Sequence, residues 1–349
     1  MKESRLLQAR QLRKTGSNNH VGARNGAPVA LLLLVLAVAI LWVPNFATTG
    51  NIRNVLVQSV PLLLTTVGQT LVIITAGIDL SVGEVVTLSA ILASGLMQPG
   101  YPGAPAAVAA CLLAGVLVGG ANAFMIGRLN LPPFLATLAT MFCLQGVNLY
   151  LRPVPGGFVP PEFRAIVTAQ VGMVPVAPVI ALLLLGVLAL HFSRSRFGLQ
   201  AYAVGGDEGR ARLSGVSTSR VKLAVYAASG VLASIAGLFL AARTGTGDPN
   251  IGSTYVFDSI TATVLGGASL LGGRGSLWGA LASALVLAIL ANVLNLLGVV
   301  TYWQWIIRGV ILVLAVAGYS VLELRERGAA NVFDALSKRF KRQAGQSAS

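Results

Sequence analysis

The chain has 349 residues, of which 55% are hydrophobic and only 10% are charged, and its formal net charge is +14. A soluble domain carries about 25% charged residues, so this chain has too few to cover a water-facing globule of its size. The composition excludes a soluble enzyme, a secreted disulfide scaffold and a disordered regulator. It predicts an all-α polytopic membrane protein. The basic residues lie in blocks between apolar runs, as topology signals do, which argues against nucleic-acid binding.

Ten apolar segments follow a basic N-terminal segment at 1–27. A membrane span needs about 20 residues at a rise of 1.5 Å per residue, and most of the segments approach this length. They lie at 28–46, 54–76, 84–98, 104–126, 133–151, 172–192, 221–242, 254–271, 277–297 and 300–322. The first is too long for the core of a secretory signal and is interpreted as an uncleaved helix. We therefore expect a transmembrane domain over 28–322 and a tail at 323–349.

The basic residues predict the orientation of these spans. With ten spans both termini lie on one side, and with that side inside, twenty of the 25 Lys and Arg residues lie there. The inner set is Lys2, Arg5, Arg10, Arg13, Lys14, Arg24, Arg128, Arg194, Arg196, Arg210, Arg212, Arg220, Lys222, Arg274, Arg325, Arg327, Lys338, Arg339, Lys341 and Arg342. Outside are Arg53, Arg152, Arg164 and Arg243, and Arg308 falls within the last span. This is the asymmetry of the positive-inside rule, so both termini are predicted to be cytoplasmic.

Two connecting segments are predicted to carry structure of their own. Residues 153–171 begin with a proline-glycine break and continue amphipathically, which indicates an outer loop with a short interfacial helix. Residues 194–220 form a long inner loop with the acids Asp207 and Glu208 beside apolar residues. A solvated connector has no need of that pattern, whereas a short amphipathic helix with a charged rim suits docking into another protein's groove.

No catalytic constellation is present, so no catalytic residue, cofactor or metal site is predicted. The sequence contains no HExxH, GxSxG or GxxxxGK[ST] pattern, and its acids form no pair at helical spacing deep in a span. Cys111 and Cys143 lie in apolar stretches, and His20 and His191 show no metal-ligand spacing. The chain therefore lacks a P-loop with which to split ATP itself.

Polar residues at membrane depth are the candidate functional residues, because each is costly unless it faces water or a partner. The candidates for a translocation path are Asp79, Ser81, Glu84, Asn122, Gln145, Asn148, Asp258, Asn292 and Asn295. Any one of them could instead hold helices together by hydrogen bonds. Spread over several spans, the set fits the lining of a hydrated path for an uncharged, hydroxyl-rich solute, since a metal-ion path would need more carboxylates.

A short pattern occurs twice. Asp79-Leu80-Ser81-Val82-Gly83 opens the third span, and Asp248-Pro249-Asn250-Ile251-Gly252 opens the eighth. The copies are five spans apart, so they would have opposite orientations in the membrane. Chance similarity of a five-residue pattern is one explanation. The other is an inverted repeat of spans 2–5 and 7–10, with broken helices near the midplane as in many transporters.

Five ordered stretches carry a resemblance to a known family. They are TLVIITAGIDLSVGEVVTLSA (70–90), NAFMIGRLNLPPFLATLATM (122–141), AVGGDEGRARLSGV (203–216), TATVLGGASLLGGRGSLWGAL (261–281) and NVLNLLGV (292–299). Over about 28–322 the chain resembles the membrane permeases of bacterial ABC importers for ribose, xylose, arabinose and related sugars. The family's inner-loop pattern usually has two alanines where this chain has Gly209 and Arg210.

The resemblance implies the permease subunit of a bacterial inner-membrane importer, which forms the path for a monosaccharide and is not itself an enzyme. It implies a cytoplasmic ABC ATPase, a second permease copy in a homodimer or heterodimer, and a periplasmic substrate-binding protein as partners. It would make 203–216 the coupling helix for the ATPase. The coupling residues would be Asp207, Glu208, Arg210, Arg212, Leu213, Gly215 and Val216.

Three other functions stay open at the level of sequence. An ABC permease could carry a branched-chain amino acid, a nucleoside or a furanone signal instead of a sugar. An ion-coupled secondary carrier would need a titratable group such as Asp79, Glu84 or Asp258. A membrane scaffold would not need the polar residues at membrane depth.

Overall fold

The computed structural model describes residues 26–100 and 102–318, which are mostly helical. The first described helix is Gly26–Trp42 and the last is Thr301–Gly318. Between them lie α2 (Thr49–Ile74), α3 (Val82–Leu96), α4 (Ala104–Gly127), α5 (Pro133–Leu151), α6 (Pro161–Thr168), α7 (Val176–Arg194), α8 (Arg196–Gly206), α9 (Glu208–Leu213), α10 (Thr218–Thr244), α11 (Ser253–Leu265) and α12 (Leu277–Leu296). The predicted tail at 323–349 and nearly all of the segment at 1–27 lie outside the described residues.

Seven of the described helices are long and apolar enough to cross a membrane. They are α2, α4, α5, α7, α10, α12 and Thr301–Gly318. The all-α polytopic membrane fold is therefore confirmed. Two further apolar helices are shorter, namely Gly26–Trp42 and α3, which has 15 residues. Helix α11 has 13 residues and carries Asp258.

Each of the ten predicted apolar segments overlaps one of these helices, and most of the ends differ by a few residues. The largest difference is in the segment predicted at 254–271, where α11 ends at Leu265. The chain continues through an irregular loop in which Gly267, Gly272 and Gly273 have positive φ angles of 89°, 82° and 69°. Glycine adopts this region readily, so the glycine-rich stretch at 266–276 ends the helix.

Helices α2 and α10 form the centre of the bundle. Almost the whole of α2 from Ser59 onward is buried, and α10 packs against α2, α3 and α4. The α4–α10 contact depends on two glycines, because a Cβ on either Gly115 or Gly230 would overlap the backbone of the other. Small residues allow such close approach of helices in membranes, where packing drives their association.

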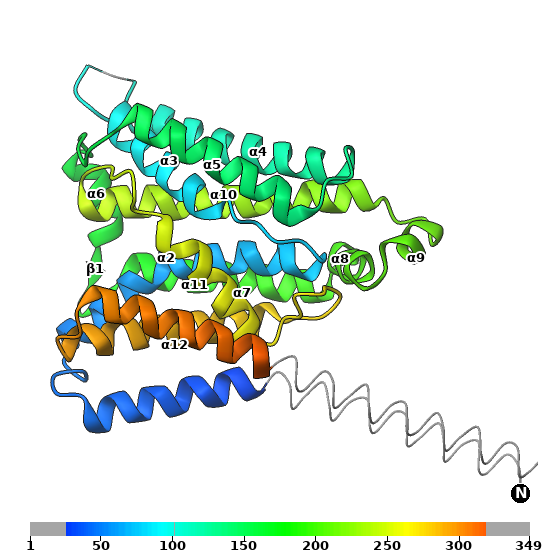
Figure 1. The fold of residues 1–349 in the computed structure, drawn as a ribbon. Coiled ribbons are helices and arrows are strands. Elements are labelled where there is room, and N and C mark those ends of the chain that lie inside the picture. Colours follow the sequence, from blue (N-terminus) through cyan, green and yellow to red (C-terminus); the bar gives the residue numbers. More distant parts are fainter. Residues whose placement is uncertain (1–25, 101, 319–349) are drawn as a thin grey trace, which may run out of the picture.

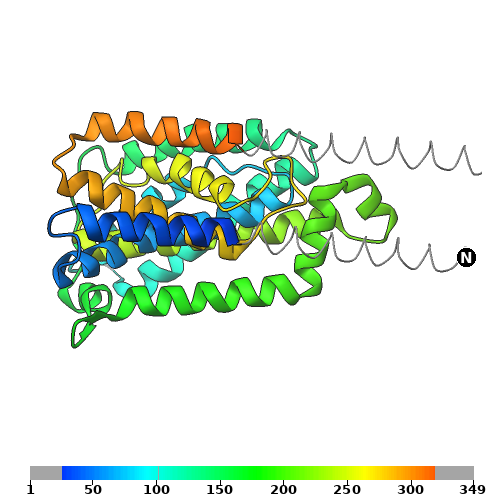
Figure 2. The ribbon, with the colours of Figure 1, turned by 90° about the horizontal axis from the view of Figure 1, so that it is seen from below.

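The two ends of the bundle differ in structure (Figures 1 and 2). Helices α8 and α9 project from one end, which also holds the start of the first described helix and the end of the last one. The opposite end holds α6 and a small antiparallel hairpin of β1 (Gln170–Val171) and β2 (Val174–Pro175). These ends are called the α8–α9 end and the α6 end below.

The loop predicted at 153–171 contains the expected short helix, α6. The loop also pairs with the segment that precedes α11. Gly156 and Gly247 exchange two backbone hydrogen bonds of 2.9 and 2.8 Å, and the amide of Val159 donates to the carbonyl of Gly245. The pairing holds 245–247 in place just before the short helix α11.

Candidate functional site

The polar residues of the first repeated segment form a buried hydrogen-bond network. Helix α2 ends at Ile74, and the chain runs without helix to Ser81 before α3 begins. One carboxylate oxygen of Asp79 accepts from the amide of Ser81 at 3.0 Å and from its hydroxyl at 2.6 Å. The other accepts from the Ser229 hydroxyl on α10 at 3.0 Å. Asp79 thus holds the non-helical segment against α10.

The network extends to two further helices. The Asn122 side chain on α4 donates to the Ser81 hydroxyl at 2.9 Å, and Thr140 on α5 donates to the Asn122 oxygen at 2.6 Å. Asp79, Ser81 and Asn122 are all buried within the chain. Three of the nine predicted path residues therefore belong to one network, which joins the start of α3 to α4, α5 and α10.

A second polar pair lies in the first turn of α3. The Asn148 side chain on α5 donates to the Glu84 carboxylate at 2.8 Å and to the Glu84 backbone carbonyl at 3.1 Å. Both residues are buried. Glu84 and Asn148 are thus also brought together, directly after the Asp79 network along α3.

The repeated segments make the same turn and meet each other. Asp248 accepts from the amide of Asn250 at 2.8 Å, as Asp79 does from that of Ser81. Both are Asx turns, in which an aspartate side chain accepts from the amide two residues later. The glycines that close the two segments are in contact, since a Cβ on Gly83 would lie 2.6 Å from the Gly252 carbonyl oxygen. The first turn of α3 and the start of α11 therefore pack backbone to backbone.

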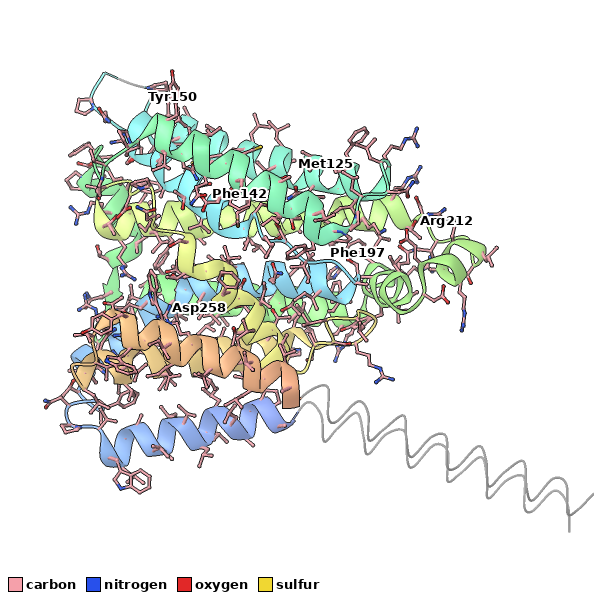
Figure 3. All side chains as sticks on the ribbon, viewed as in Figure 1. Met125, Phe142, Tyr150, Phe197, Arg212 and Asp258 are labelled. Atoms are coloured by element: carbon pink, nitrogen blue, oxygen red, sulfur yellow. The ribbon has the colours of Figure 1, made fainter. Side chains whose placement is uncertain are left out.

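The other four predicted path residues lie apart from this network. Gln145 is exposed on α5. Asn292 exchanges two hydrogen bonds of 3.0 and 2.9 Å with Asn51, and Asn295 accepts from Gln304 at 2.9 Å. Asp258 on α11 forms a 2.8 Å ion pair with Arg308 on the helix Thr301–Gly318. Figure 3 shows Asp258 on the α11 side of that helix.

The predicted coupling segment consists of two helices rather than one. Ser195 caps α8 by accepting from the amide of Gly198, and Asp207 caps α9 by accepting from the amide of Arg210. A single helix through 203–216 does not form because Asp207 has the extended conformation of an N-cap, with φ −164° and ψ 104°. Gly215 ends the segment with φ +83°.

The surface of α9 is charged and carries an unpacked apolar side chain. Asp207 pairs with Arg210, and Glu208 lies within reach of both Arg212 and Lys222. Burial alone would raise the pKa of Glu208, but the hydrogen bond and charge of Lys222, with smaller contributions from Thr218 and Arg212, lower this pKa below its ordinary value. Leu213 at the end of α9 is 90% exposed. Figure 3 shows Arg212 on the same projection.

Helices α8 and α9, the predicted coupling segment, contact the two helices that precede the repeated segments. On α8, the Tyr202 hydroxyl donates to the Gly275 carbonyl at 2.8 Å, and a Cβ on Gly205 would overlap the Ile74 carbonyl at the end of α2. On α9, Glu208 binds Lys222 at the start of α10 at 2.6 Å. Helices α2 and α10 lead directly into the Asp79 and Asp248 segments. The projection is therefore tied to the helices that precede both turns.

A cavity of about 360 Å³ separates α9 from the Asp79 network. It is lined by the chain after α2, the α4–α5 loop, α8 and the start of α10, and Glu208, Lys222 and Tyr226 face it. The Tyr226 hydroxyl lies 3.5 Å from the carbonyl of Ile78, beside Asp79. This space lies at the α8–α9 end, next to the non-helical segment between α2 and α3.

Comparison with known proteins assigns this architecture. The profile of a family described as "Branched-chain amino acid transport system / permease component" matches residues 51–316. The chain belongs to this permease family. The matched range includes both repeated segments, helices α8 and α9 and the Asp258–Arg308 pair.

Curated relatives cover most of the permease. The ribose import permease protein of Escherichia coli K12 is 38% identical over 296 residues, which are 82% of this chain and 91% of the relative. That of Bacillus subtilis is 36% identical over 83% and 91% of the two chains. The galactose/methyl galactoside import permease protein of Salmonella typhimurium LT2 is 32% identical over 87% and 96%. No solved structure matches the permease significantly.

Several residues of these polar groups were missed by the sequence reasoning. Asn51 and Gln304, which pair with predicted path residues, lie near the ends of apolar runs and resemble ordinary boundary residues. Ser229 and Thr140 are single hydroxyls within long apolar helices. Arg308 was the one detectable signal, because a charge within a span is costly without a partner.

Replacing Asp79 with leucine should destabilise the permease. The change leaves the Ser81 amide, the Ser81 hydroxyl and the Ser229 hydroxyl without their buried acceptor, at a cost of about 1–3 kcal/mol for each unsatisfied donor. We expect a clearly lower thermal unfolding temperature of the purified protein in detergent. The control is Asp248→Leu, which removes the equivalent Asx turn at a half-exposed position. Equal losses in both variants would contradict this role for the network.

Proposed function

We propose that the chain is the membrane-spanning subunit of an ABC importer and forms the translocation path for a monosaccharide. The observation that carries this proposal is the 38% identity to a ribose import permease over 82% of the chain and 91% of the relative. The galactose permease relative extends the class from pentoses to hexoses. The polar groups at membrane depth, mostly amides and hydroxyls, fit a neutral solute rich in hydroxyl groups.

The proposed arrangement is one domain over 28–322 with ten crossings and both termini in the cytoplasm of a bacterial inner membrane. Seven helices have the length of a span, and the shorter helices Gly26–Trp42, α3 and α11 would complete the set. The inner set of basic residues includes Arg128, Arg274 and those of the coupling segment. The described loops that hold them lie at the α8–α9 end. That end would face the cytoplasm by the positive-inside rule.

The proposed inverted repeat relates spans 2–5 to spans 7–10. Its support is local: two matching segments make the same Asx turn, each leads into a short helix, and their closing glycines are in contact. Short helices that begin near the midplane and meet at a repeat interface are a common way to build a transport site. The nine polar candidates remain our proposal for residues along the path.

The proposed partners are an ABC ATPase at the α8–α9 end, a second permease copy and a periplasmic binding protein at the α6 end. The ATPase would bind α9, where Leu213 is exposed beside the charged residues Asp207 and Arg210. When the ATPase dimer binds ATP and closes, it would move α8 and α9. Their contacts with Ile74 and Lys222 would transmit this displacement through α2 and α10 to the segments that contain Asp79 and Asp248. The path would then open alternately to either side.

Uptake by the reconstituted complex tests this function. The permease, its ATPase and its binding protein are placed in proteoliposomes, and accumulation of labelled ribose, galactose and leucine is measured. We expect accumulation of a monosaccharide that requires ATP and survives an uncoupler. Accumulation of leucine alone would support a branched-chain amino acid, which the family's description names. Uptake without ATP that an uncoupler stops would indicate an ion-coupled carrier and overturn the proposal.

A further inference from the structure

A second cavity of about 400 Å³ lies between α11 and the last described helix, Thr301–Gly318. Its walls combine hydroxyl-bearing, charged and aromatic side chains. They include Ser253, Thr254, Phe257, Asp258, Trp305 and Arg308. The cavity begins at the first turn of α11, directly after Gly252, and so adjoins the contact between the two repeated segments.

The cavity contains an ion pair that joins the two helices. Arg308 donates to Asp258 at 2.8 Å, and both side chains are mostly withdrawn from the surface. Placing charges at membrane depth is costly, and such residues are typically functional. The same chain joins α2 to α12 by the neutral Asn51–Asn292 pair, which makes two hydrogen bonds without any charge. A charged pair at a similar helix contact therefore calls for a different explanation.

The aromatic walls of the cavity are exposed. Phe257 is 61% exposed and Trp305 is 63% exposed, although each lies beside the ion pair. Pockets for small molecules are lined mainly by apolar and aromatic groups, with a few polar groups that set orientation. Here the polar groups are the carboxylate, the guanidinium and the hydroxyls of Ser253 and Thr254. The lining thus offers hydrogen-bond acceptors and donors next to flat apolar faces.

We propose that this cavity binds the transported monosaccharide on its way through the permease, an inference that rests on the proposed function. A sugar presents vicinal hydroxyls, which can donate to Asp258 and accept from Arg308, and C–H faces, which can stack on Trp305 or Phe257. The pair is neutral as a unit, so it favours a neutral solute over a phosphate or an anionic headgroup.

A pair of tryptophans on one helix gives a matched test. Trp305 lines the cavity, whereas Trp303, which is 55% exposed on the same helix, does not. In proteoliposomes with the ATPase and binding protein, we expect Trp305→Ala to lower monosaccharide uptake about tenfold, the loss expected for one stacked aromatic ring. ATP hydrolysis stimulated by the binding protein should persist. Trp303→Ala should transport as the unchanged permease does.

The double variant Asp258→Asn/Arg308→Gln removes the charges without leaving either one unpaired. It should insert and assemble normally and lose uptake to a similar degree. If the unchanged permease accumulates a monosaccharide and both Trp305→Ala and the double variant do so equally well, the cavity is not on the path and the inference fails. A variant that loses assembly and ATP hydrolysis together with uptake would also overturn it, since the residues would then be structural. Failure of the unchanged permease to carry any monosaccharide would instead reject the proposed function.

Protection from labelling gives a direct readout of binding. Thr254→Cys in a Cys143→Ser background places a thiol on the cavity wall, and its reaction with a small maleimide can be followed in the assembled complex. We expect millimolar monosaccharide to slow this reaction severalfold and leucine to leave it unchanged. Protection by leucine but not by sugar would contradict the proposed solute class.

Discussion

Replacing Gly252 with valine should abolish transport. Its Cβ would overlap the carbonyl oxygen of Gly83 and lie 2.6 Å from the Thr87 hydroxyl. The obstructing atom belongs to the backbone of α3, which cannot rotate away as a side chain can. The φ angle of Gly252 is −93°, which any residue adopts, so the expected effect comes from the overlap alone.

The expected cost is about 3 kcal/mol or more, at the upper end of the range for overpacked interiors. The two short helices would have to separate, and the hydrogen bond from the Gly252 amide to Thr87 would be lost with them. We therefore expect reduced insertion yield or a folded protein without uptake. Both can be measured by fluorescence-detected size exclusion and by proteoliposome assay.

Gly146→Val is the matched control for this prediction. Gly146 lies within α5, and a Cβ there would have no atom within 4 Å. The control should fold and transport normally, because a valine there meets no other atom and has a slightly higher helix propensity than the glycine it replaces. Normal uptake by Gly252→Val would show that the two short helices are free to move apart, and it would remove the main support for a repeat interface at this contact.

The sequence predicted which segments form helices better than where those helices end. A long apolar run is enough to indicate a membrane helix, and each of the ten predicted runs overlaps a described helix. Helix ends depend on local turns within tertiary contacts. The end of α11 at Leu265 is set by glycines whose positive φ angles accommodate contacts with the end of α2, such as the bond from the Gly273 amide to the Ile74 carbonyl. No pattern within 254–271 encodes that contact.

In the candidate site too, features made by neighbouring residues could be predicted, whereas contacts between distant helices could not. The repeated motif could be found because it consists of neighbouring residues, and its two copies do meet at Gly83 and Gly252. The partners of its polar groups come from distant helices, such as Ser229 for Asp79 and Arg308 for Asp258. A single sequence carries no signal for which hydroxyl or charge will lie opposite which. Polar residues at membrane depth can therefore be recognised as unusual before their partners are known.

The contacts of α9 and those of the Asp79 network both involve the central helix α10. Lys222, Tyr226 and Ser229 are spaced along one face of α10, and they contact in turn Glu208 of α9, the Ile78 carbonyl and Asp79. Residues three and four apart share a face of an α-helix. One rigid helix face thus joins the projecting α9 to the start of α3. A displacement of α9 would reach the non-helical segment between α2 and α3 through this face of α10. It would also reach that segment through the contact between α8 and Ile74 at the end of α2.

The double variant Glu208→Lys/Leu213→Asp should insert normally and fail to associate with its ATPase. Leu213 is 90% exposed at the tip of the α8–α9 end, so replacing it removes no internal contact. Apolar anchors at the centre of a docking surface contribute about 2 kcal/mol or more each. The Glu208 substitution reverses the charge of the rim and breaks the 2.6 Å contact with Lys222, which leaves the Arg212–Thr218 hydrogen bond as a link between α9 and α10. Affinity purification should recover the permease with little ATPase.

Leu271→Asp is the control for this prediction. Leu271 is 67% exposed in the glycine-rich loop between α11 and α12, outside the coupling segment. This control should retain the ATPase, because the charge it introduces is not on α9. The single variants separate the two effects: Leu213→Asp alone should weaken association, whereas Glu208→Lys alone should also reduce uptake by any complex that still forms. Recovery of a normal complex from the double variant would show that the ATPase binds elsewhere, and transport would then have to be driven through a surface other than α9.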